Sequence, residues 1–405
     1  MKIALLAPSD RSFIKEFLPN VNIDHLPLGF SGAPFIGTLI RDFIDFGHTV
    51  CAITTTKAIN DDYSIKRFTY NNFTWVVVPY RPASIKMNGK KIGRILDFYA
   101  YEQNQMLKVL NQGNPDFVHA HWSYEFAGTA VKFKTPYLVT VHDNPFVVLR
   151  YFKNLYRFGR LLMAEQILKK VRNASTVSPY MFDYVKKRIE NVKVIPNPIK
   201  VQYSFTEVKT MIDIKLGSLN AAKIMMVNNG WDQRKNGKKA LESFTIIQKK
   251  FPNVSLHLFG GGSEKGGLAY KDALDLKVQN VFFNGVVTRD YLLNELKTAH
   301  FLLHPALEES FGVVLIEAMS MGVPPIGGDH SGAVPWVINQ EKLLVDVRNV
   351  QLITEKIVSL IKDKILYRDV SLKGYTNVME RFSSTSIAQQ YLSYYSEILN
   401  TKSND

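Results

Sequence analysis

Short apolar runs alternate with stretches of helical spacing along most of the chain. In the first half these runs include KIALLAP, HTVCAITTT and FTWVVVPY, and in the second half they include AKIMMVNNG, VSLHLFGGG and HFLLHPA. Helical spacing is seen between them, as in PFIGTLIRDFIDFG and NGKKALESFTIIQKKF. Strands that are apolar on both sides are typical of parallel sheets covered by helices. The pattern therefore predicts an α/β fold with buried parallel sheets.

The length of the chain indicates two domains. A chain of 405 residues is too long for one ordinary core. The strand pattern pauses over residues 195–218 and starts again at Ala222, so we expect a linker there and a boundary near residue 200. This predicts a Rossmann-like domain over residues 1–200 and another over residues 201–381. Since ligands of open α/β sheets bind beyond the carboxyl ends of the strands, we expect the two domains to face each other across a cleft.

Charge is unevenly distributed along the chain. Residues 1–200 hold 27 basic and 15 acidic side chains, a net charge of +12, whereas residues 201–405 hold 23 and 21, a net charge of +2. The first half should therefore attract an anionic partner. Cys51 is the single cysteine, which excludes an internal disulfide and fits a reducing compartment. Without an apolar stretch of membrane-spanning length or a secretion signal, we expect a cytoplasmic protein.

The stretch LLHPALEESFGVVLIEAMSMGVPPIGG, residues 302–328, indicates a buried helix with an anion site at its start. We expect Ser310 to cap the helix and Phe311 to open its first turn. The backbone N–H groups of Phe311, Gly312 and Val313, together with the helix dipole, would then suit a phosphate group.

Two glutamates in this stretch need partners. Glu309 stands just before the expected cap, and Glu317 follows about two turns into the helix among apolar residues. A buried carboxylate without donors is costly, and a ribose diol would supply two hydroxyl groups to Glu317. The alternative for Glu317 is a partly exposed helix residue or one satisfied by a neighbouring lysine. We expect Glu308 to be a solvated neighbour without a role.

The segment ESFGVVLIE resembles the E-x7-E signature of the group 1 (family 4) retaining glycosyltransferases, and the surrounding residues resemble that family as well. The resemblance implies the GT-B fold, with two Rossmann-like domains. It further implies that Glu309 contacts the donor sugar and Glu317 the ribose of a nucleotide sugar. The backbone at Phe311, Gly312 and Val313 would hold sugar hydroxyls and the diphosphate.

A lysine segment of the family is matched by RKNGKKALESF. The resemblance places Lys235 on the donor phosphates. The family usually has an arginine six residues earlier, where this chain has Asn229, so Arg234 is expected to supply the second positive charge. A strict Asp-x-Asp metal signature does not occur in the sequence, and we expect neither a metal nor a cofactor.

Matches in the first half are looser. YLVTVHDNP resembles the strand that ends in the family's active-site histidine, which makes His142 the match. His119 and His121 are interpreted as residues that pack beneath the site. GFSGAPFIGTLIRDFIDFGH resembles the glycine loop and first helix, which would bring Gly32 against the donor phosphate.

Two further segments complete the resemblance. FFNGVV matches a segment whose backbone often reads the base, which predicts base contacts at Gly285 and Val286. The tail, residues 382–405, resembles the last helix of the family, which packs back across the first domain.

The reaction implied is transfer of a hexosyl-type sugar with retention, by front-face attack in which the leaving diphosphate accepts the proton. The expected catalytic set is His142, Lys235 and Glu309. We expect a UDP-linked donor and a saccharide or lipid-linked saccharide acceptor, in bacterial surface polysaccharide biosynthesis. Two alternatives are a nucleotide-sugar 2-epimerase of the same fold and a sugar-nucleotide-binding protein without catalysis.

A basic and aromatic stretch, residues 150–174, is the candidate acceptor or membrane patch. Such a face can lie on an anionic membrane, which would place the enzyme peripherally at the inner face of the cell membrane. An ordinary amphipathic helix with a solvated basic face is an equally good interpretation. Nucleic acid is not an expected partner, because no binding motif accompanies the charge. The patch residues are Arg150, Lys153, Arg157, Arg160, Lys169 and Lys170.

Overall fold

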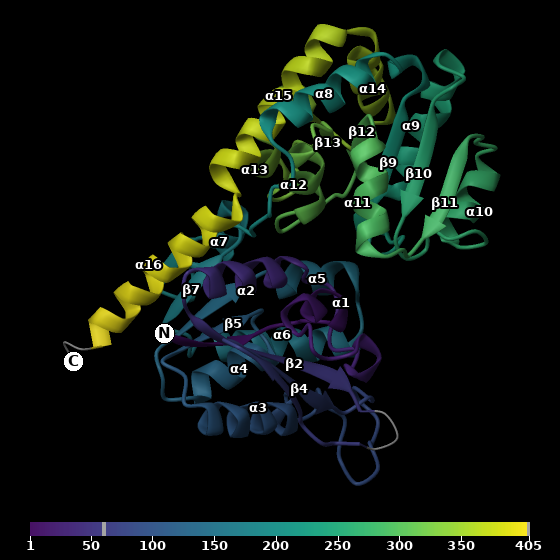
Figure 1. The fold of residues 1–405 in the computed structure, drawn as a ribbon. Coiled ribbons are helices and arrows are strands. Elements are labelled where there is room, and N and C mark those ends of the chain that lie inside the picture. Colours follow the sequence, from purple (N-terminus) through teal and green to yellow (C-terminus); the bar gives the residue numbers. More distant parts are fainter. Residues whose placement is uncertain (59–61, 403–405) are drawn as a thin grey trace. The chain divides into compact units, whose positions relative to one another are not determined.

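The computed structural model describes residues 1–58 and 62–402 of the chain. Residue contacts divide the chain into two compact units. Unit 1 comprises Met1–Pro198 and Ser384–Asp405, and unit 2 comprises Ile199–Ser383. Both units are built on mainly parallel sheets with helices between the strands, as the alternating pattern predicts (Figure 1).

The sheet of unit 1 has the strand order β3-β4-β2-β1-β5-β6-β7-β8 within the described residues. Its neighbouring strands are parallel except for β3 and β4, which are antiparallel. The sequence pattern does not predict β3, because this edge strand is largely exposed and has no apolar run. The strands are β1 (Lys2–Leu6), β2 (Thr49–Lys57), β3 (Lys66–Tyr70), β4 (Phe73–Tyr80), β5 (Phe117–His121), β6 (Tyr137–Val141), β7 (Asn173–Thr176) and β8 (Asn191–Val194).

Helices cover both faces of this sheet, with α2 on one side and α3 and α4 on the other (Figure 1). Pro145 and Pro179 open α5 and α7, each after a side chain, Asn144 or Ser178, that accepts a backbone N–H and caps the helix. The helices of unit 1 are α1 (Arg11–Ile14), α2 (Phe35–Asp45), α3 (Ala100–Gly113), α4 (Glu125–Lys132), α5 (Pro145–Tyr151), α6 (Leu155–Leu168), α7 (Pro179–Val185) and α16 (Ser384–Lys402).

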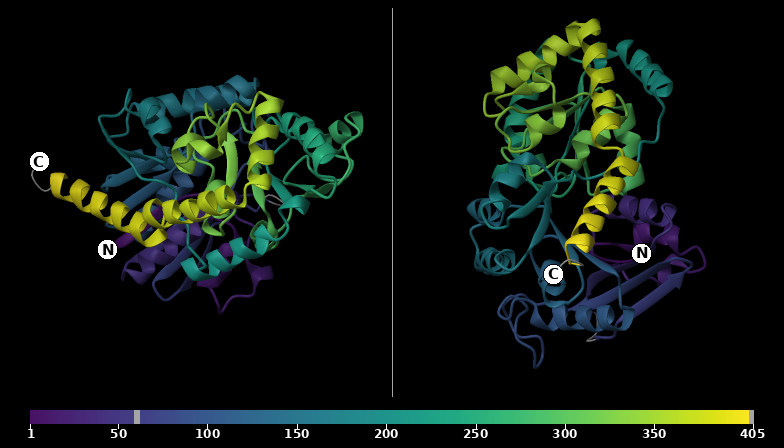
Figure 2. Two further views of the ribbon diagram at one scale, coloured as in Figure 1. Left: turned by 90° about the horizontal axis from the view of Figure 1, so that it is seen from above. Right: turned by 90° about the vertical axis from the view of Figure 1, so that its left-hand side faces the viewer.

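The last helix, α16, packs against α2 and β6 of unit 1, and Figure 2 shows it beside the purple and blue segments of that unit. Its Tyr395 hydroxyl lies 2.6 Å from Nδ1 of His119, and its ring stacks on Phe117 with centroids 4.2 Å apart. Tyr394 donates a hydrogen bond of 3.2 Å to the carbonyl of Asn191. These buried polar contacts fix α16 on the sheet of unit 1.

The sheet of unit 2 has the order β11-β10-β9-β12-β13-β14 in the described residues, and its neighbouring strands are parallel. Parallel strands place their carboxyl ends at one edge of the sheet, so the segments that follow β9, β10, β11 and β12 gather there. The strands are β9 (Lys223–Val227), β10 (Ser255–Phe259), β11 (Val281–Gly285), β12 (Phe301–His304), β13 (Pro325–Gly328) and β14 (Leu344–Val345).

Residues 195–218, which the sequence pattern assigns to a linker, contain a helix. This helix, α8, starts with a capping box in which Ser204 and Glu207 exchange hydrogen bonds, and it packs on α15. The linker prediction was wrong because α8 lacks a strong apolar period. The helices of unit 2 are α8 (Phe205–Leu216), α9 (Gly237–Lys250), α10 (Leu268–Asp275), α11 (Arg289–Thr298), α12 (Val313–Ser320), α13 (Val334–Ile338), α14 (Val350–Lys362) and α15 (Lys364–Arg381).

Candidate active site

The segments after β9 and β12 bring two oppositely charged residues together in unit 2. Nζ of Lys235 donates a hydrogen bond of 3.0 Å to Oε2 of Glu309. Lys235 lies in a short 3-10 helix, Gln233–Lys235, whose start is capped by the side chain of Asp232. The Lys235 side chain is 9% exposed and that of Glu309 is 19% exposed. Two of the residues predicted to be catalytic therefore form a nearly buried ion pair at the carboxyl edge of the sheet.

Glu309 is held in its charged form. Burial raises the pKa of its carboxyl group, but the positive charge of Lys235, with smaller contributions from His304 and Arg234, lowers it to about 2. At neutral pH Glu309 is therefore a carboxylate that can accept hydrogen bonds from hydroxyl groups and has no proton to give.

Glu308 is not a solvated neighbour. It is buried, and its Oε2 lies 3.7 Å from Nη1 of Arg234. The backbone N–H of Leu307 donates a hydrogen bond of 2.8 Å to the carbonyl of Arg234, which ties the two segments together. The prediction for Glu308 was wrong because the partner of its side chain comes from a segment more than 70 residues away in sequence.

The helix that carries Glu317 starts later than predicted. α12 begins at Val313, and its N-cap is Gly312, whose φ of 85° lies in the left-handed region that favours glycine. Ser310 is therefore not the cap. The ring of Phe311 is buried against Trp336, and the N–H groups of Gly312 and Val313 lie at the start of the helix.

Glu317 lies about one turn into α12 and has a charged partner. The residue is 3% exposed, and its Oε1 lies 2.6 Å from Nη2 of Arg289 at the start of α11. The contact is an ion pair without hydrogen-bond alignment. The Arg289 side chain is 42% exposed and therefore has room to move. The alternative of a neighbouring cation thus holds, with Arg289 in place of a lysine.

The segment predicted to contact the base lies beside this pair in sequence. Gly285 ends β11 with a φ of 62°, and Val286 is 80% exposed. The same loop leads to Arg289, which reaches Glu317. The structure thus connects the predicted base-contacting segment with the predicted ribose residue through one side chain.

Sequence analysis missed two buried polar residues at the same sheet edge. His304 ends β12 with Nε2 3.8 Å from Oε2 of Glu309, and burial lowers its pKa to about 4. Asn228 directly follows β9 and is 3% exposed. Neither side chain has a hydrogen-bond partner among the described residues. Both residues could have been found in the sequence, because each is a polar residue at the end of an apolar strand. Asn229, which stands where the family usually has an arginine, is exposed.

In unit 1, His142 follows β6 and is nearly buried. Its Nε2 lies 2.9 Å from Nδ1 of His121, and its ring stacks on that of Trp122 with centroids 4.2 Å apart. Burial lowers the pKa of His142 to about 3. His119 and His121 are fully buried, as predicted. Gly32 has a φ of 110° and lies in the loop before α2, where an added Cβ would meet nothing within 4 Å.

The basic patch of unit 1 is only partly on the surface. Arg150, Lys153, Lys169 and Lys170 are exposed, and Arg157 is half-buried over aromatic rings. The surface prediction was wrong for Arg160. Its Nη1 donates a hydrogen bond of 2.6 Å to buried Glu125, and its guanidinium lies 3.5 Å from the centre of the Tyr124 ring.

Within residues 1–58 and 62–402, His, Cys, Asp and Glu side chains form no group that could hold a metal ion. Every helix there is too short or too polar to cross a membrane.

Comparisons with known proteins agree across the chain. A family model described as glycosyl transferases group 1 matches residues 212–377, and one described as glycosyltransferase family 4 matches residues 34–203. The chain is 25% identical over 328 residues to N-acetyl-alpha-D-glucosaminyl L-malate synthase of Bacillus anthracis. This match covers 74% of this chain and 80% of the relative. It is 32% identical over 163 residues to the capsular polysaccharide biosynthesis glycosyltransferase CapM of Staphylococcus aureus. That match covers 39% of this chain and 42% of CapM.

Solved structures show the same fold. Sucrose-phosphate synthase from Thermosynechococcus elongatus superposes with a TM-score of 0.72 at 18% identity, covering 99% of this chain and all of the other. Anabaena Alr3699/HepE in complex with UDP and glucose gives a TM-score of 0.67 at 15% identity, covering 98% and 100%. The chain therefore belongs to the group 1, family 4 glycosyltransferases and has their GT-B fold, with a Rossmann-like α/β sheet in each unit.

Proposed function

We propose that this glycosyltransferase moves a hexosyl-type sugar from a UDP-sugar to a saccharide or lipid-linked saccharide acceptor, with retention and without a metal. The observation that carries the donor site is the pair of Lys235 and Glu309 beside the start of α12, with Glu317 on the same helix. A cation, a helix start and two carboxylates suit a ligand that has phosphates at its centre and hydroxyl groups at both ends.

The charges at this edge determine what each residue can do. Glu309, with its low pKa, would accept hydrogen bonds from the hydroxyl groups of the donor sugar. Lys235 and the N–H groups of Gly312 and Val313 would stabilise charge on the departing diphosphate. Glu317 would hold the ribose once Arg289 has moved away from its carboxylate.

The reaction balances without a protein nucleophile. The acceptor oxygen forms a bond to the anomeric carbon, the bond from that carbon to the diphosphate oxygen breaks, and the acceptor proton passes to the diphosphate. His142 has a pKa of about 3 and is neutral at physiological pH, so its role would be to orient a hydroxyl group and not to supply charge.

The charge of the chain and its relatives support the proposed acceptor and setting. Residues 1–200 carry the net charge of +12, which favours an anionic or lipid-phosphate acceptor. CapM acts in capsular polysaccharide biosynthesis, and another relative is a poly(glycerol-phosphate) alpha-glucosyltransferase of Bacillus subtilis. We infer a role in surface polysaccharide biosynthesis, in the cytoplasm and peripherally at the inner face of the cell membrane.

Turnover of the donor tests the proposal. Release of UDP from UDP-glucose and UDP-N-acetylglucosamine should be detected with the wild type when a candidate saccharide or lipid-linked saccharide acceptor is present. One electrostatic donor typically raises the rate of such a step about a hundredfold, so Lys235→Ala should lose most of the UDP release. Lys238→Ala is the matched control, since Lys238 is exposed on α9 three positions later. Unchanged turnover in Lys235→Ala would contradict the assigned role.

Two competing functions have to be separated from glycosyl transfer, and Asn229, where the family usually has an arginine, favours the first of them. A sugar-nucleotide-binding protein without catalysis would bind UDP-sugars and release no UDP, with or without candidate acceptors. A 2-epimerase would instead release UDP or interconvert donors without needing any acceptor. Product analysis by mass spectrometry distinguishes the three outcomes.

A further inference from the structure

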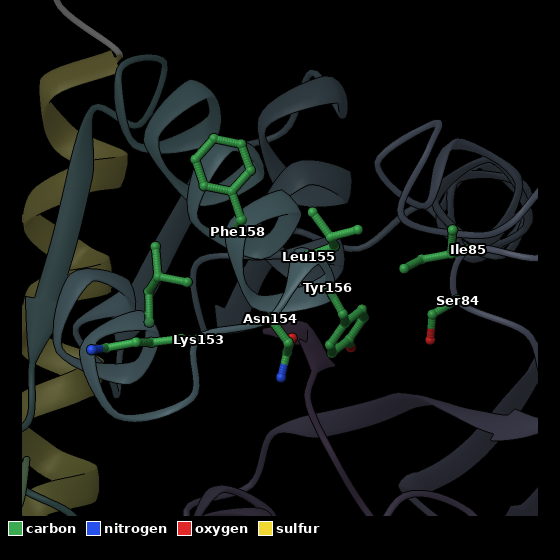
Figure 3. A pocket seen from close by; sticks show the side chains of 8 residues that line it. Ser84, Ile85, Lys153, Asn154, Leu155, Tyr156 and Phe158 are labelled. Atoms are coloured by element: carbon green, nitrogen blue, oxygen red, sulfur yellow. The ribbon is translucent and has the colours of Figure 1, made fainter.

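Unit 1 has an open apolar groove of about 940 Å³ on its surface. One side is formed by Ser84 and Ile85, and the other by residues of α5 and α6 and the turn between them. Figure 3 shows Leu155 and Tyr156 between Ile85 on one side and Lys153 on the other. The groove lies on the face that carries part of the basic patch, but Ile85 belongs to a segment that the sequence pattern did not single out.

The segment that contains Ile85, residues 82–96, is a loop whose polar side chains hold its own backbone. Asn88 accepts a hydrogen bond from the N–H of Ala83 and donates to the carbonyls of Ala83 and Ile92. Arg94 donates to the carbonyl of Arg81. The backbones of Asn88 and Lys91 exchange two hydrogen bonds across a tight turn. The loop is therefore firmly tied from within.

The apolar side chains of the same loop are exposed. Ile85 and Ile92 are each 43% exposed, and Met87 and Leu96 are each 59% exposed. Surface loops of proteins that meet only water usually have the opposite arrangement. Because Asn88 and Arg94 are used to tie the backbone, the exposure of the apolar side chains is built into the loop.

One face of α6 continues this surface. Leu155, Phe158 and Leu162 are spaced by three and four residues, so they share a helix face, and they are 76%, 49% and 42% exposed. The helix is fixed against the loop at Gly159, where an added Cβ would lie 2.6 Å from the side chain of Ile95. We call the resulting surface the apolar surface, defined by Ile85, Met87, Ile92, Leu96, Leu155, Phe158 and Leu162.

The two segments that form the apolar surface carry charges of one sign, and Asp97, which follows the first of them, is paired with Arg81. Residues 82–96 and 145–164 contain neither aspartate nor glutamate. They contain exposed cations, among them Lys86, Lys90, Arg150 and Lys153. A second copy of this chain would bring like charges together, and a free saccharide would gain little from exposed Leu and Met side chains. Exposed apolar groups with a cationic rim match an anionic lipid surface.

We propose that the apolar surface docks on an anionic phospholipid membrane, with the loop at residues 82–96 and the first turns of α6 as the inserted elements. Met87 and Leu155 enter the boundary between headgroups and acyl chains, while Lys86, Lys90 and Lys153 lie at the headgroup phosphates. This names the surface and the lipid class for the membrane contact proposed above. It does not depend on the assignment of the donor site.

Vesicle co-sedimentation of the full chain tests the proposal. The vesicles are phosphatidylcholine alone or an equimolar mixture of phosphatidylcholine and phosphatidylglycerol. We expect binding to the mixed vesicles, weaker binding to phosphatidylcholine and loss of binding at high salt. Lys153→Glu should weaken binding by at least about fivefold, since each basic residue near an anionic surface contributes about that factor.

Apolar variants separate insertion from charge attraction. Met87→Ser and Leu155→Ser should each weaken binding severalfold while the thermal unfolding curve stays unchanged, because both side chains are exposed. Ile365→Ser, on α15 and 84% exposed, and Lys187→Glu, on another exposed segment, are the controls that should bind like the wild type.

Three results would overturn the proposal. The first is an absence of binding to the mixed vesicles, and the second is equal binding by Leu155→Ser and the wild type. The third is a dimer in sedimentation velocity without lipid that Leu155→Ser abolishes, since the apolar surface would then join two copies of the chain. None of these results would bear on UDP release, so failure of this inference is distinguishable from failure of the proposed reaction.

Discussion

Replacing Lys235 by Met should destabilise the protein measurably, even without any ligand. The change keeps the length of the side chain and removes its charge, which leaves Glu309 without the donor that lies 3.0 Å from its Oε2. The pair is mostly shielded from water, so the lost attraction is only weakly replaced by solvent.

The magnitude follows from the pKa of Glu309. A fall from 4.5 to about 2 corresponds to about 3 kcal/mol of stabilisation of the charged form. Lys235 makes the largest favourable contribution, and His304 and Arg234 share the rest. We therefore expect Lys235→Met to lower the free energy of unfolding by about 2 kcal/mol at pH 7.

The effect has a defined pH dependence. Because the folded-state pKa of Glu309 is depressed, its stabilisation is fully present above pH 4.5 and is lost as the pH falls towards 2. The difference between wild type and variant should therefore be largest near neutral pH and should shrink below pH 4.5.

Urea denaturation followed by circular dichroism, at several pH values, measures this difference. Lys238→Met is the control, because an exposed lysine without a buried partner should change stability by less than about 0.5 kcal/mol. Equal stability of Lys235→Met and the wild type at pH 7 would show that the ion pair does not stabilise the fold. A difference that persists unchanged at low pH would show that it does not arise from the charge of Glu309.

Three further predictions concern single residues. Arg289→Ala should raise the affinity for UDP severalfold in isothermal titration calorimetry, because the ribose no longer competes with the guanidinium for Glu317; weaker binding would instead make Arg289 a ligand contact. Gly312→Ala should lower stability by about 1–2 kcal/mol, since the residue has a left-handed φ and the new Cβ would lie 2.8 Å from Leu315; an unchanged melting temperature would argue against this backbone geometry. His142 should show no protonation step between pH 5 and 8 in an NMR titration, because burial lowers its pKa to about 3.

The sequence predicts most of the fold because apolar runs mark buried strands directly. β1, β2 and β9 match predicted runs, and they pair with parallel neighbours in their sheets. β3 is missed because an exposed edge strand does not need apolar residues. α8 is missed because its buried residues are few and its start is set by the local hydrogen bonds of a capping box.

The sequence does not predict those contacts of the site in which the two side chains come from distant segments. Spacing and resemblance single out Lys235 and Glu309, and the structure brings them into contact. Spacing cannot show that Arg289 reaches Glu317, because their approach depends on how α11 packs beside α12. It cannot show that Arg160 turns inward either, since Glu125, its partner, lies on another helix.

The helix start illustrates a local limit. Ser310 fits the composition of an N-cap, but the backbone places Gly312 there in a left-handed conformation. Sequence preferences for Ser and Gly at this position overlap, so only the φ angle decides between them.

Binding of a nucleotide in unit 2, with its ribose on Glu317, can be measured by ligand-induced thermal stabilisation. UDP, GDP, ADP and their common sugars are added to the wild type and to Glu317→Gln. At 100 times its dissociation constant a ligand adds about 2.7 kcal/mol to stability. We expect UDP and UDP-sugars to raise the melting temperature of the wild type, and Glu317→Gln to lose most of this shift. Equal stabilisation of both proteins by UDP, or none of the wild type by any nucleotide, would contradict this expectation.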